Sequence, residues 1–386
     1  MKEGWVYKKF SDVFELQMGK TPSRDNPLYW KGQNTWVSIS DLQNKYIDSS
    51  KENITDKAVS ESNIKIVKKG TVIMSFKLSV GRCAIAAKDL FTNEAIMSFT
   101  PIKEGVVLPD YIYYYLKGYE WTGANKAVMG ITLNKKSISS NVFAYPPLSE
   151  QQRIVSELDL LSSIIEKKKA QLKEYDQLAQ SIFYDMFGDP VTNEKGWEVK
   201  KLGEVCSKIT DGTHDTPQRL DKGVKFITGK HIRPFIVDYD NSDYVSEEVH
   251  KEIYLRCNPE YGDVLYTNIG AGIGNAAINI VEYEFSMKNV ALLKLHKSIA
   301  DGFFIEFYLN NDKIKSAIIE NFSNGGAQKF LSLKSIAKIS VSIPPLSLQQ
   351  SFASKIEAIE RQKALIRQSI TEAETLFNSR MDFWFS

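Results

Sequence analysis

The stretch Pro146–Phe187 constrains the fold most, because its sequence predicts one long helix with well-marked ends. The helix is expected to begin after the two adjacent prolines, since a proline inside a helix removes a hydrogen bond and clashes with the preceding turn. Ser149 followed three residues later by Gln152 is the capping-box pattern, which satisfies two free backbone N–H groups. At the other end, Gly188 can adopt a left-handed conformation and Pro190 prevents continuation of the helix.

Apolar residues recur along this helix at alternating steps of four and three, which is the spacing of a helix that packs along a second helix. Lys168 is the one charged residue on this seam. The predicted apolar seam consists of Ile154, Leu158, Leu161, Ile165, Leu172, Tyr175, Ile182 and Met186.

A matching helix is predicted at the C-terminus, where Pro344–Gln350 repeats the block Pro146–Gln152, including the serine and glutamine of the cap. Its predicted seam consists of Phe352, Ile356, Ile359, Ile366, Ile370 and Phe377. We expect the two helices to pair as a coiled coil. The alternative, two separate helices lying on a core, fits less well because this seam is narrower than the apolar stripe of a surface helix.

The repeat extends through the rest of the chain, and the order and spacing of the matched segments are preserved. The matched pairs are Trp5–Val13 with Trp197–Val205, Gly70–Ile73 with Gly262–Leu265, Ser79–Ile85 with Gly272–Ile278, and Leu133–Ile138 with Leu331–Ile336. Within the helices, Ile182–Phe183 matches Leu376–Phe377 best, which predicts a second helix about four residues shorter than the first.

These matches predict an α+β protein made of two copies of one unit, a strand-rich globular domain followed by a long helix. β-Branched and aromatic runs cut by Gly and Asn indicate the strands. Asp110–Leu116 and Phe303–Leu309 are expected to be short helices whose aromatic residues serve the core rather than stack on bases. The predicted boundaries are 1–145 and 189–343 for the globular domains, and 146–188 and 344–386 for the antiparallel helices.

Composition limits the possible functions. With 386 residues, 43% hydrophobic and 25% charged, the chain has the make-up of a soluble protein of two or more domains. Its net charge is only +2, so nucleic-acid binding would depend on local basic patches. No segment could span a bilayer, and the N-terminus does not open a signal peptide. The isolated Cys83, Cys206 and Cys257 suit a reducing cytosol, so a cytoplasmic location is expected.

The sequence contains no recognisable catalytic motif. Gly270–Gly274 has its third glycine one place early for a dinucleotide loop, and a tight turn between strands is expected there. The four histidines lack metal-ligand spacing. Tyr145–Leu148 and Ile343–Leu346 lack the polar and aromatic ends of the tetrad that methylates adenine, and no nuclease cluster of carboxylates and lysine is evident. The chain is therefore predicted to be no enzyme and to hold no metal.

With these features the chain resembles the specificity subunit of type I restriction–modification systems. The resemblance covers nearly the whole chain and rests on two diverged domains alternating with two long helices, each entered through Pro-Pro-Leu-Ser-x-x-Gln. Gly19–Arg24 and Thr210–Pro217 are similar to segments found early in target-recognition domains. Leu348 departs from the first copy, which has Glu150 there; the cap is unaffected, but a residue available to a partner changes.

The resemblance implies a mechanism. Each globular domain would read one half of a split, asymmetric site in double-stranded DNA, and the helix pair would fix the unread gap. Two modification subunits, which bind S-adenosylmethionine and methylate adenine at N6, would clamp the DNA. Two motor–nuclease restriction subunits would join them for cleavage. S-adenosylmethionine, ATP and magnesium are accordingly expected in the partner subunits and not in this chain.

Base reading needs hydrogen-bonding side chains on loops that reach a groove, and phosphate contacts use Lys, Arg, Ser or Thr. The candidates in the first domain are Lys20, Thr21, Ser23, Arg24, Asn26, Lys31, Lys77, Ser79 and Arg82. The candidates in the second domain are Thr213, His214, Thr216, Gln218, Arg219, Lys222, Lys225, Lys230, His231, Arg233, Asn268 and Asn275.

Two other functions stay open from the residues alone. The chain could be a self-contained DNA-modifying enzyme or nuclease with an unrecognised active site, and activity of the isolated chain would then be seen. It could also be a coiled-coil scaffold that binds proteins, in which case salt-sensitive affinity for DNA would be missing.

Overall fold

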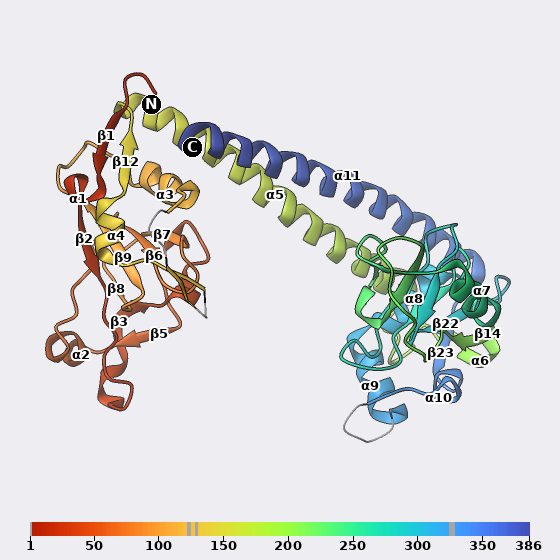
Figure 1. Cartoon of the computed structure of the whole chain (residues 1–386). Helices are drawn as coiled ribbons and strands as arrows, with labels where there is room; N and C mark the ends of the chain where they lie inside the picture. The colour runs from red at the N-terminus through yellow and green to blue at the C-terminus, as the bar shows by residue number, and fades with distance from the viewer. Residues whose placement is uncertain (1, 122–124, 128–129, 324–328) are drawn as a thin grey trace. The chain divides into compact units, whose positions relative to one another are not determined.

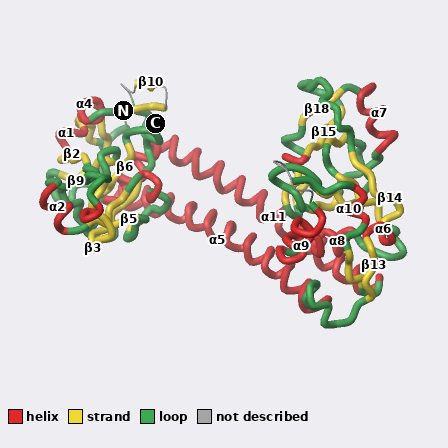
Figure 2. The backbone as a smooth tube through the Cα atoms, turned by 90° about the horizontal axis from the view of Figure 1, so that it is seen from below, coloured by secondary structure: helices red, strands yellow, loops and turns green. Residues whose placement is uncertain are grey.

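The computed structural model describes residues 2–121, 125–127, 130–323 and 329–386 (Figure 1). Two compact units make up the chain: unit 1 contains Met1–Lys169 and Gln368–Ser386, and unit 2 contains Ala170–Arg367. Each unit joins one globular domain to one half of each long helix. Figure 2 distinguishes the strands, which lie in the globular domains, from the two long helices.

The globular domain of unit 1 is built on a five-stranded sheet of order β2-β9-β6-β7-β4 and a three-stranded sheet of order β5-β3-β8. The first sheet contains β2 (Phe14–Met18), β4 (Tyr46–Ile47), β6 (Val72–Ser75), β7 (Cys83–Ala86) and β9 (Ile96–Pro101), and the second contains β3 (Trp30–Val37), β5 (Glu52–Ile54) and β8 (Phe91–Thr92). Two strand pairs are β1 (Val6–Lys9) with β12 (Val142–Tyr145) and β10 (Asn125–Ala127) with β11 (Gly130–Thr132). The short helices are α1 (Phe10–Val13), α2 (Asp56–Glu61), α3 (Pro109–Gly118) and α4 (Lys135–Ser140).

The globular domain of unit 2 repeats this plan, with sheets of order β14-β22-β19-β20 and β18-β15-β21. The strands are β14 (Cys206–Asp211), β15 (Val224–Thr228), β18 (Asp243–Val245), β19 (Val264–Tyr266), β20 (Ala276–Ile278), β21 (Ser286–Lys288) and β22 (Ala291–Leu295). Two strand pairs are β13 (Glu198–Lys201) with β23 (Ser340–Ile343) and β16 (Ile232–Arg233) with β17 (Ile236–Val237). The short helices are α6 (Leu202–Val205), α7 (Glu247–Arg256), α8 (Gly302–Asn310), α9 (Asp312–Phe322) and α10 (Leu333–Ala337).

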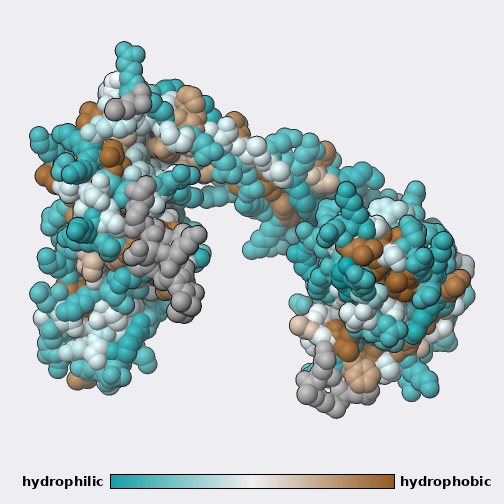
Figure 3. All heavy atoms as spheres, viewed as in Figure 1, coloured by the Kyte–Doolittle hydropathy of each residue, from teal (hydrophilic) through white to brown (hydrophobic). Residues whose placement is uncertain are grey.

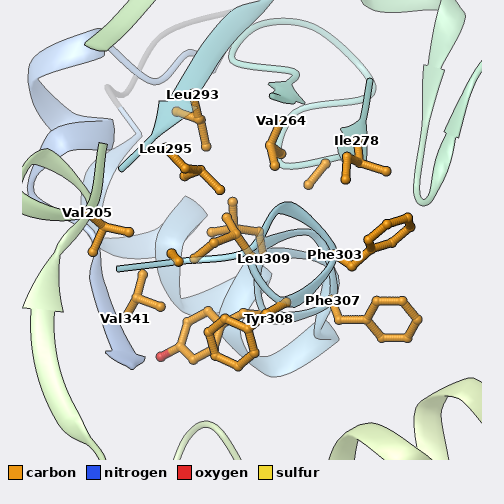
Figure 4. Packing of buried hydrophobic residues seen from close by; sticks show 14 of the residues in the cluster. Val205, Val264, Ile278, Leu293, Leu295, Phe303, Phe307, Tyr308, Leu309 and Val341 are labelled. Atoms are coloured by element: carbon orange, nitrogen blue, oxygen red, sulfur yellow. The ribbon is translucent and has the colours of Figure 1, made fainter. Parts of the chain in front are cut away.

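Both short aromatic segments form helices that serve the core, as expected. In unit 2, Leu309 of α8 belongs to the same buried cluster as Val264 of β19 and Leu293 of β22 (Figure 4). In unit 1, Tyr111 of α3 is fully buried, and its hydroxyl donates to the carbonyl oxygen of Ala144 at 2.8 Å. The α+β prediction is confirmed.

The two long helices are α5 (Leu148–Phe187) and α11 (Leu346–Phe385), each 40 residues long. The prediction of a shorter second helix is therefore wrong. With equal lengths, the counterpart of Phe183 is Met381 rather than Phe377. Phe183 and Met381 are both buried in the core of their own unit, and sequence similarity alone had matched Phe183 to a different turn.

The predicted capping boxes are also wrong, because both helices begin before the serine. The N–H groups of Glu150 and Gln151 donate to the carbonyl oxygen of Pro147 at 3.0 Å. Ser149 thus lies within the first turn of α5. It is therefore not the N-cap, which is the residue just before the helix.

The glutamine after this turn attaches each helix to its globular domain. In unit 1, the side chain of Gln151 accepts from the N–H of Leu108 at 2.9 Å and donates to the carbonyl oxygen of Val106 at 3.0 Å. In unit 2, Gln349 accepts from Asp301 at 3.0 Å and donates to Ile299 at 3.1 Å. Both glutamines are fully buried, so the repeated motif positions a helix-to-domain anchor rather than a cap.

Helices α5 and α11 pack together and run antiparallel within each unit (Figure 1). In unit 1, Glu157 pairs with Arg380, and Lys169 pairs with Glu374 at 2.7 Å. In unit 2, Lys363 pairs with Asp176 at 2.7 Å. As the residue number on α5 increases, the residue number of its partner on α11 decreases, so the two helices run in opposite directions.

The side chains of the predicted seam are all buried or half-buried within their units. Lys168 is half-buried, whereas Lys363, the charged residue on the apolar side of the other helix, is buried and is held by Asp176 and Glu360. A charged group in this position costs free energy unless it is paired, so its pairing restricts the register of the two helices.

Candidate nucleic-acid interface

In both domains, a glycine directly follows the first strand of the larger sheet and begins a loop. A Cβ on Gly19 would lie 2.2 Å from the carbonyl oxygen of Thr92, and a Cβ on Gly212 would lie 1.9 Å from that of Met287. The next residue then donates its N–H to the same carbonyl, at 2.8 Å from Lys20 and at 2.9 Å from Thr213. Only glycine fits where the two backbone segments come this close, so both loops start from the same point of the fold.

The loop of unit 1 is held on two tryptophans and one glutamate. The guanidinium of Arg24 donates to both carboxylate oxygens of Glu52, at 2.5 and 3.0 Å, and lies 3.9 Å from the centre of the Trp30 ring. The hydrogen bond to Glu52 raises the pKa of Arg24 above its ordinary value. The indole N–H of Trp36 donates to the carbonyl oxygen of Lys20 at 3.1 Å.

The loop of unit 2 is held in a similar way. The guanidinium of Arg219 lies 4.2 Å from the centre of the Phe226 ring, and its Nε is 3.4 Å from the carboxylate of Asp243. Lys230 shares this carboxylate at 3.1 Å. Two cations thus face one carboxylate, which leaves a local positive excess.

Unit 2 has a hollow of about 460 Å³ beside this carboxylate. Its lining brings together Arg219, Lys230, the turn Gly270–Gly272, Lys288 and Asn289. Asn289 has a left-handed backbone, and its side-chain oxygen Oδ1 accepts a hydrogen bond from Nδ1 of His214 at 2.9 Å. The ammonium group of Lys288 donates to the hydroxyl of Thr216. The loop and two further turns therefore converge on one basic hollow.

The glycine-rich segment Gly270–Gly274 forms the predicted turn between β19 and β20, closed by a hydrogen bond from the N–H of Gly274 to Thr267 at 2.8 Å. Its counterpart in unit 1 joins β6 to β7 and carries Lys77, Ser79 and Arg82. The side chains of Ser79 and Arg82 are exposed there.

Some predicted residues have other structural roles. His231 is buried, its ring nitrogen Nδ1 accepts from the N–H of Thr228 at 2.9 Å, and burial lowers its pKa. Asn275 is also buried and donates to the carbonyl oxygen of Ile232, and Asn268 donates to that of Leu331. These three residues are therefore not part of the proposed DNA-contacting surface.

The remaining candidates divide by their contacts. Asn26 accepts from the N–H of Leu28 and so stabilises the turn after Arg24, and Lys225 donates to the carbonyl oxygen of Tyr239 at 2.7 Å. Arg233 pairs with Asp238 at 3.4 Å, outside the hollow lining. The exposed members without such a structural role are Lys20, Ser23, Lys31, Ser79, Arg82, Gln218 and Lys222.

Sequence reasoning missed the carboxylates and rings that hold the two arginines, and it missed Lys288 and Asn289. A usable signal was present: Thr21-Pro22-Ser23-Arg24 and Thr216-Pro217-Gln218-Arg219 share the pattern Thr-Pro-x-Arg. The loop of unit 2 has two more residues between the glycine and this pattern. The pattern therefore does not align at the same sequence offset as the matched segments before it.

The visible face of both domains is largely hydrophilic (Figure 3). Across the described ranges, no three His, Cys, Asp or Glu side chains are grouped to hold a metal ion. Among the helices that the structure describes, none is long and apolar enough to cross a membrane.

Two repeated strand-rich domains, each presenting a basic loop, together with two paired long helices, define a class of DNA-specificity proteins. The chain belongs to the family described as "Type I restriction modification DNA specificity domain", whose model matches twice, at residues 2–174 and 194–375. It is thus the non-catalytic specificity subunit of a type I restriction–modification system and gives that system its DNA sequence specificity.

Named relatives agree with this assignment. The chain is 28% identical to the type I restriction enzyme MjaIX specificity subunit of Methanocaldococcus jannaschii, over 92% of this chain and 86% of that protein. It is 19% identical to the EcoKI specificity subunit of Escherichia coli, over 98% and 87%. The fold is similar to the crystal structure of the S subunit from M. genitalium, with a TM-score of 0.58, 15% identity and coverage of 98% and 95%. A second structure, from work on assembly of the type I system, has a TM-score of 0.60, 17% identity and coverage of 100% and 98%.

Proposed function

We propose that this chain recognises a split, asymmetric site in double-stranded DNA, with one half-site read by each globular domain. The observation that carries the proposal is that the DNA-specificity model matches both halves of the chain, while the loops they share differ in side chains. Unit 1 presents Thr21 beside Glu94, whereas unit 2 presents His214 beside Asn289. Equal scaffolds with unequal donors and acceptors suit two different half-sites.

The helix pair would act as a spacer between the two readers. Forty residues at about 1.5 Å per residue give each helix a length of about 60 Å. A paired helix cannot change length as a flexible linker can, so the number of unread base pairs would be fixed.

Two modification subunits and the motor–nuclease restriction subunits are the proposed partners. The repeated unit offers each modification subunit an equivalent docking surface, which suits a symmetric pair. S-adenosylmethionine, ATP and magnesium would be bound by these partners, so this chain would direct adenine-N6 methylation and cleavage without taking part in either. Because the target is chromosomal and foreign DNA, the complex would work in the cytoplasm.

The decisive experiment combines the purified chain with its cognate modification subunits and S-adenosylmethionine. Methylated adenines, mapped by sequencing, are expected at one split motif, and the chain alone is expected to transfer no methyl groups. Replacing residues 1–145 by the equivalent domain of a relative should change one half-site only. A change in both halves, or methyl transfer by the chain alone, would contradict the proposal.

A further inference from the structure

The repeated Thr-Pro-x-Arg pattern places one arginine at the same point of each domain. Arg24 is held by a carboxylate of β5, and Arg219 is held by a carboxylate of β18. Each carboxylate strand pairs antiparallel with the central strand of its three-stranded sheet. The agreement therefore extends to the topology of the strands around the arginine.

The strand register also places the aromatic residue and the carboxylate residue at equivalent positions in the two domains. Trp36 on β3 is directly opposite Glu52, and Phe226 on β15 is directly opposite Asp243. In both domains the arginine lies over an aromatic ring of this central strand, at 5.1 Å in unit 1 and 4.2 Å in unit 2. An arginine, a ring and a carboxylate thus form the same triad twice, which we call the arginine triad (Arg24–Trp36–Glu52 and Arg219–Phe226–Asp243).

The residues around the triads have diverged. Unit 1 has a second ring, Trp30, against the guanidinium, whereas unit 2 has Lys230 on the shared carboxylate. The turns beside the loops differ as well, with Glu94 bonded to Thr21 in one unit and Lys288 bonded to Thr216 in the other. The triad is what the two loops keep in common.

Two readers of different half-sites share only the sugar–phosphate backbone as a target. A residue that selects a base should differ between such readers, whereas a residue that contacts phosphate can be the same in both. We infer that Arg24 and Arg219 each donate to a DNA phosphate and set the position of their loop on its half-site, while the diverged neighbours select the bases. This inference rests on the proposed function and assigns two residues within it.

The chemistry of the triad suits this role. A guanidinium has five N–H donors, and Glu52 uses two of those on Arg24, whose side chain remains 53% exposed. The carboxylate and the ring fix the planar group in one orientation, so little side-chain freedom is lost when phosphate binds. Glu52 and Asp243 are therefore positioning residues in this scheme.

The test measures DNA binding by the complex of the full chain with its modification subunits over a series of salt concentrations. Two duplexes are compared, one with the mapped split site and one with a single half-site scrambled. For Arg24→Met and Arg219→Met, we expect affinity to fall about tenfold on both duplexes and the slope of log affinity against log salt to decrease by about one. The ratio of affinities for the two duplexes should stay at the wild-type value.

Matched variants separate this from other roles. Lys68→Met removes a more exposed cation that is also paired with a carboxylate, Asp89 at 2.8 Å, in the same domain, and it should leave the slope unchanged. Glu52→Gln keeps the arginine charge, so affinity should fall less than for Arg24→Met and the slope should be kept.

Three outcomes would overturn the inference. A loss of preference for one half-site at an unchanged salt slope would make the arginine a base reader. Lower thermal stability of Arg24→Met and Glu52→Gln alike, with unchanged binding, would make the triad a loop brace. An unchanged affinity and slope would show that the arginine does not touch DNA. A wild-type complex with no preference for a split site would instead refute the proposed function itself.

Discussion

The two globular domains share one plan, but one point of contact between each domain and the long helices differs in chemistry. In unit 1, Lys45 lies between the carboxylates of Asp110 at 2.7 Å and Asp159 at 2.5 Å, with the ring of Tyr114 at 4.8 Å. Asp159 is on α5 and Asp110 is on α3, so this lysine links the domain to the long helix.

In unit 2, aromatic rings take the place of this polar network. Phe235, which precedes the short strand β17 as Lys45 precedes β4, lies 4.7 Å from Phe307 of α8. The centre of the Phe307 ring in turn lies 6.0 Å from that of Phe183 on α5 and 5.1 Å from that of Phe352 on α11. At this point the junction is thus aromatic in unit 2 and ionic in unit 1, although both junctions also contain buried hydrophobic residues of the long helices.

The comparison shows which part of the junction the fold requires. Gln151 and Gln349 make equivalent backbone hydrogen bonds in the two units, whereas the side chains around them have changed character. Backbone anchoring is set by the geometry of the helix start, but the surrounding contacts only need to fill the space and satisfy their polar groups. Two junctions of unequal chemistry should therefore respond differently to mutation, pH and salt.

The largest effect is expected from Phe183→Ala in the aromatic junction. Phe183 is 1% exposed, and its removal leaves a cavity between α8 and the helix pair. We expect a loss of about 3–5 kcal/mol in the free energy of unfolding, measured by urea denaturation. Leu178→Ala, on the exposed side of the same helix, should cost less than about 0.5 kcal/mol. Equal losses for the two variants would contradict a junction centred on Phe183.

The shared anchors should give equal effects in the two units. Gln151→Ala and Gln349→Ala each leave a buried N–H and buried carbonyl oxygens without their partner, which costs about 1–3 kcal/mol. Urea denaturation measures the loss, and hydrogen exchange in α3 and α8 locates it. Gln152→Ala removes the neighbouring exposed glutamine and is the matched control. A large effect in one unit only would show that the anchors are not equivalent.

The sequence predicted the helices and the repeat because prolines, heptads and matched segments are local signals. It could not predict the true role of Gln151, since the groups that this side chain bonds come from a loop 43 residues earlier. Similarly, Glu52 reaches Arg24 only through the register of β5 with β3, which pairing decides and spacing does not. The helix lengths were misjudged because Phe183 was matched by residue type, although its burial in the domain core makes Met381 its counterpart.

A buried carboxyl group makes the stability of unit 2 depend on pH between about 4.5 and 8. Glu306 on α8 is buried beside the N–H of Ile278, and burial raises its pKa to about 8. Its stabilising protonation is complete below the unfolded pKa near 4.5 and is lost as pH rises towards 8, so stability falls over that range. Glu306→Gln should raise the free energy of unfolding by a few kcal/mol at pH 8 and by less than about 1 kcal/mol at pH 5. Tyr113 occupies the corresponding turn of α3 in unit 1.

Urea denaturation at the two pH values measures this difference. Glu320→Gln, on the exposed face of α9, is the control and should show no dependence on pH. A gain from Glu306→Gln that is equal at both pH values would mean that the carboxyl group is not protonated in the folded protein.

The smallest effect is expected at the ionic junction of unit 1. Burial raises the pKa of Asp110, but hydrogen bonds from Lys45 and Tyr46 outweigh this and hold it below its ordinary value. The stabilisation from this carboxylate is therefore present above pH 4 and is lost as pH falls further. Lys45→Met should cost about 1 kcal/mol at pH 7, since the pair is partly exposed, and almost nothing below pH 3.

Salt provides the sharper comparison between the two junctions. The cost of Lys45→Met should shrink in 1 M sodium chloride, because ions screen the partly exposed pair. Phe235→Met, at the corresponding place in unit 2, changes an apolar contact, so its cost should be independent of salt and of pH between 3 and 7. Urea denaturation of both variants at low and high salt measures this contrast. If Lys45→Met were as insensitive to salt as Phe235→Met, the lysine would act through the packing of its aliphatic chain against Tyr114, and the two junctions would be alike after all.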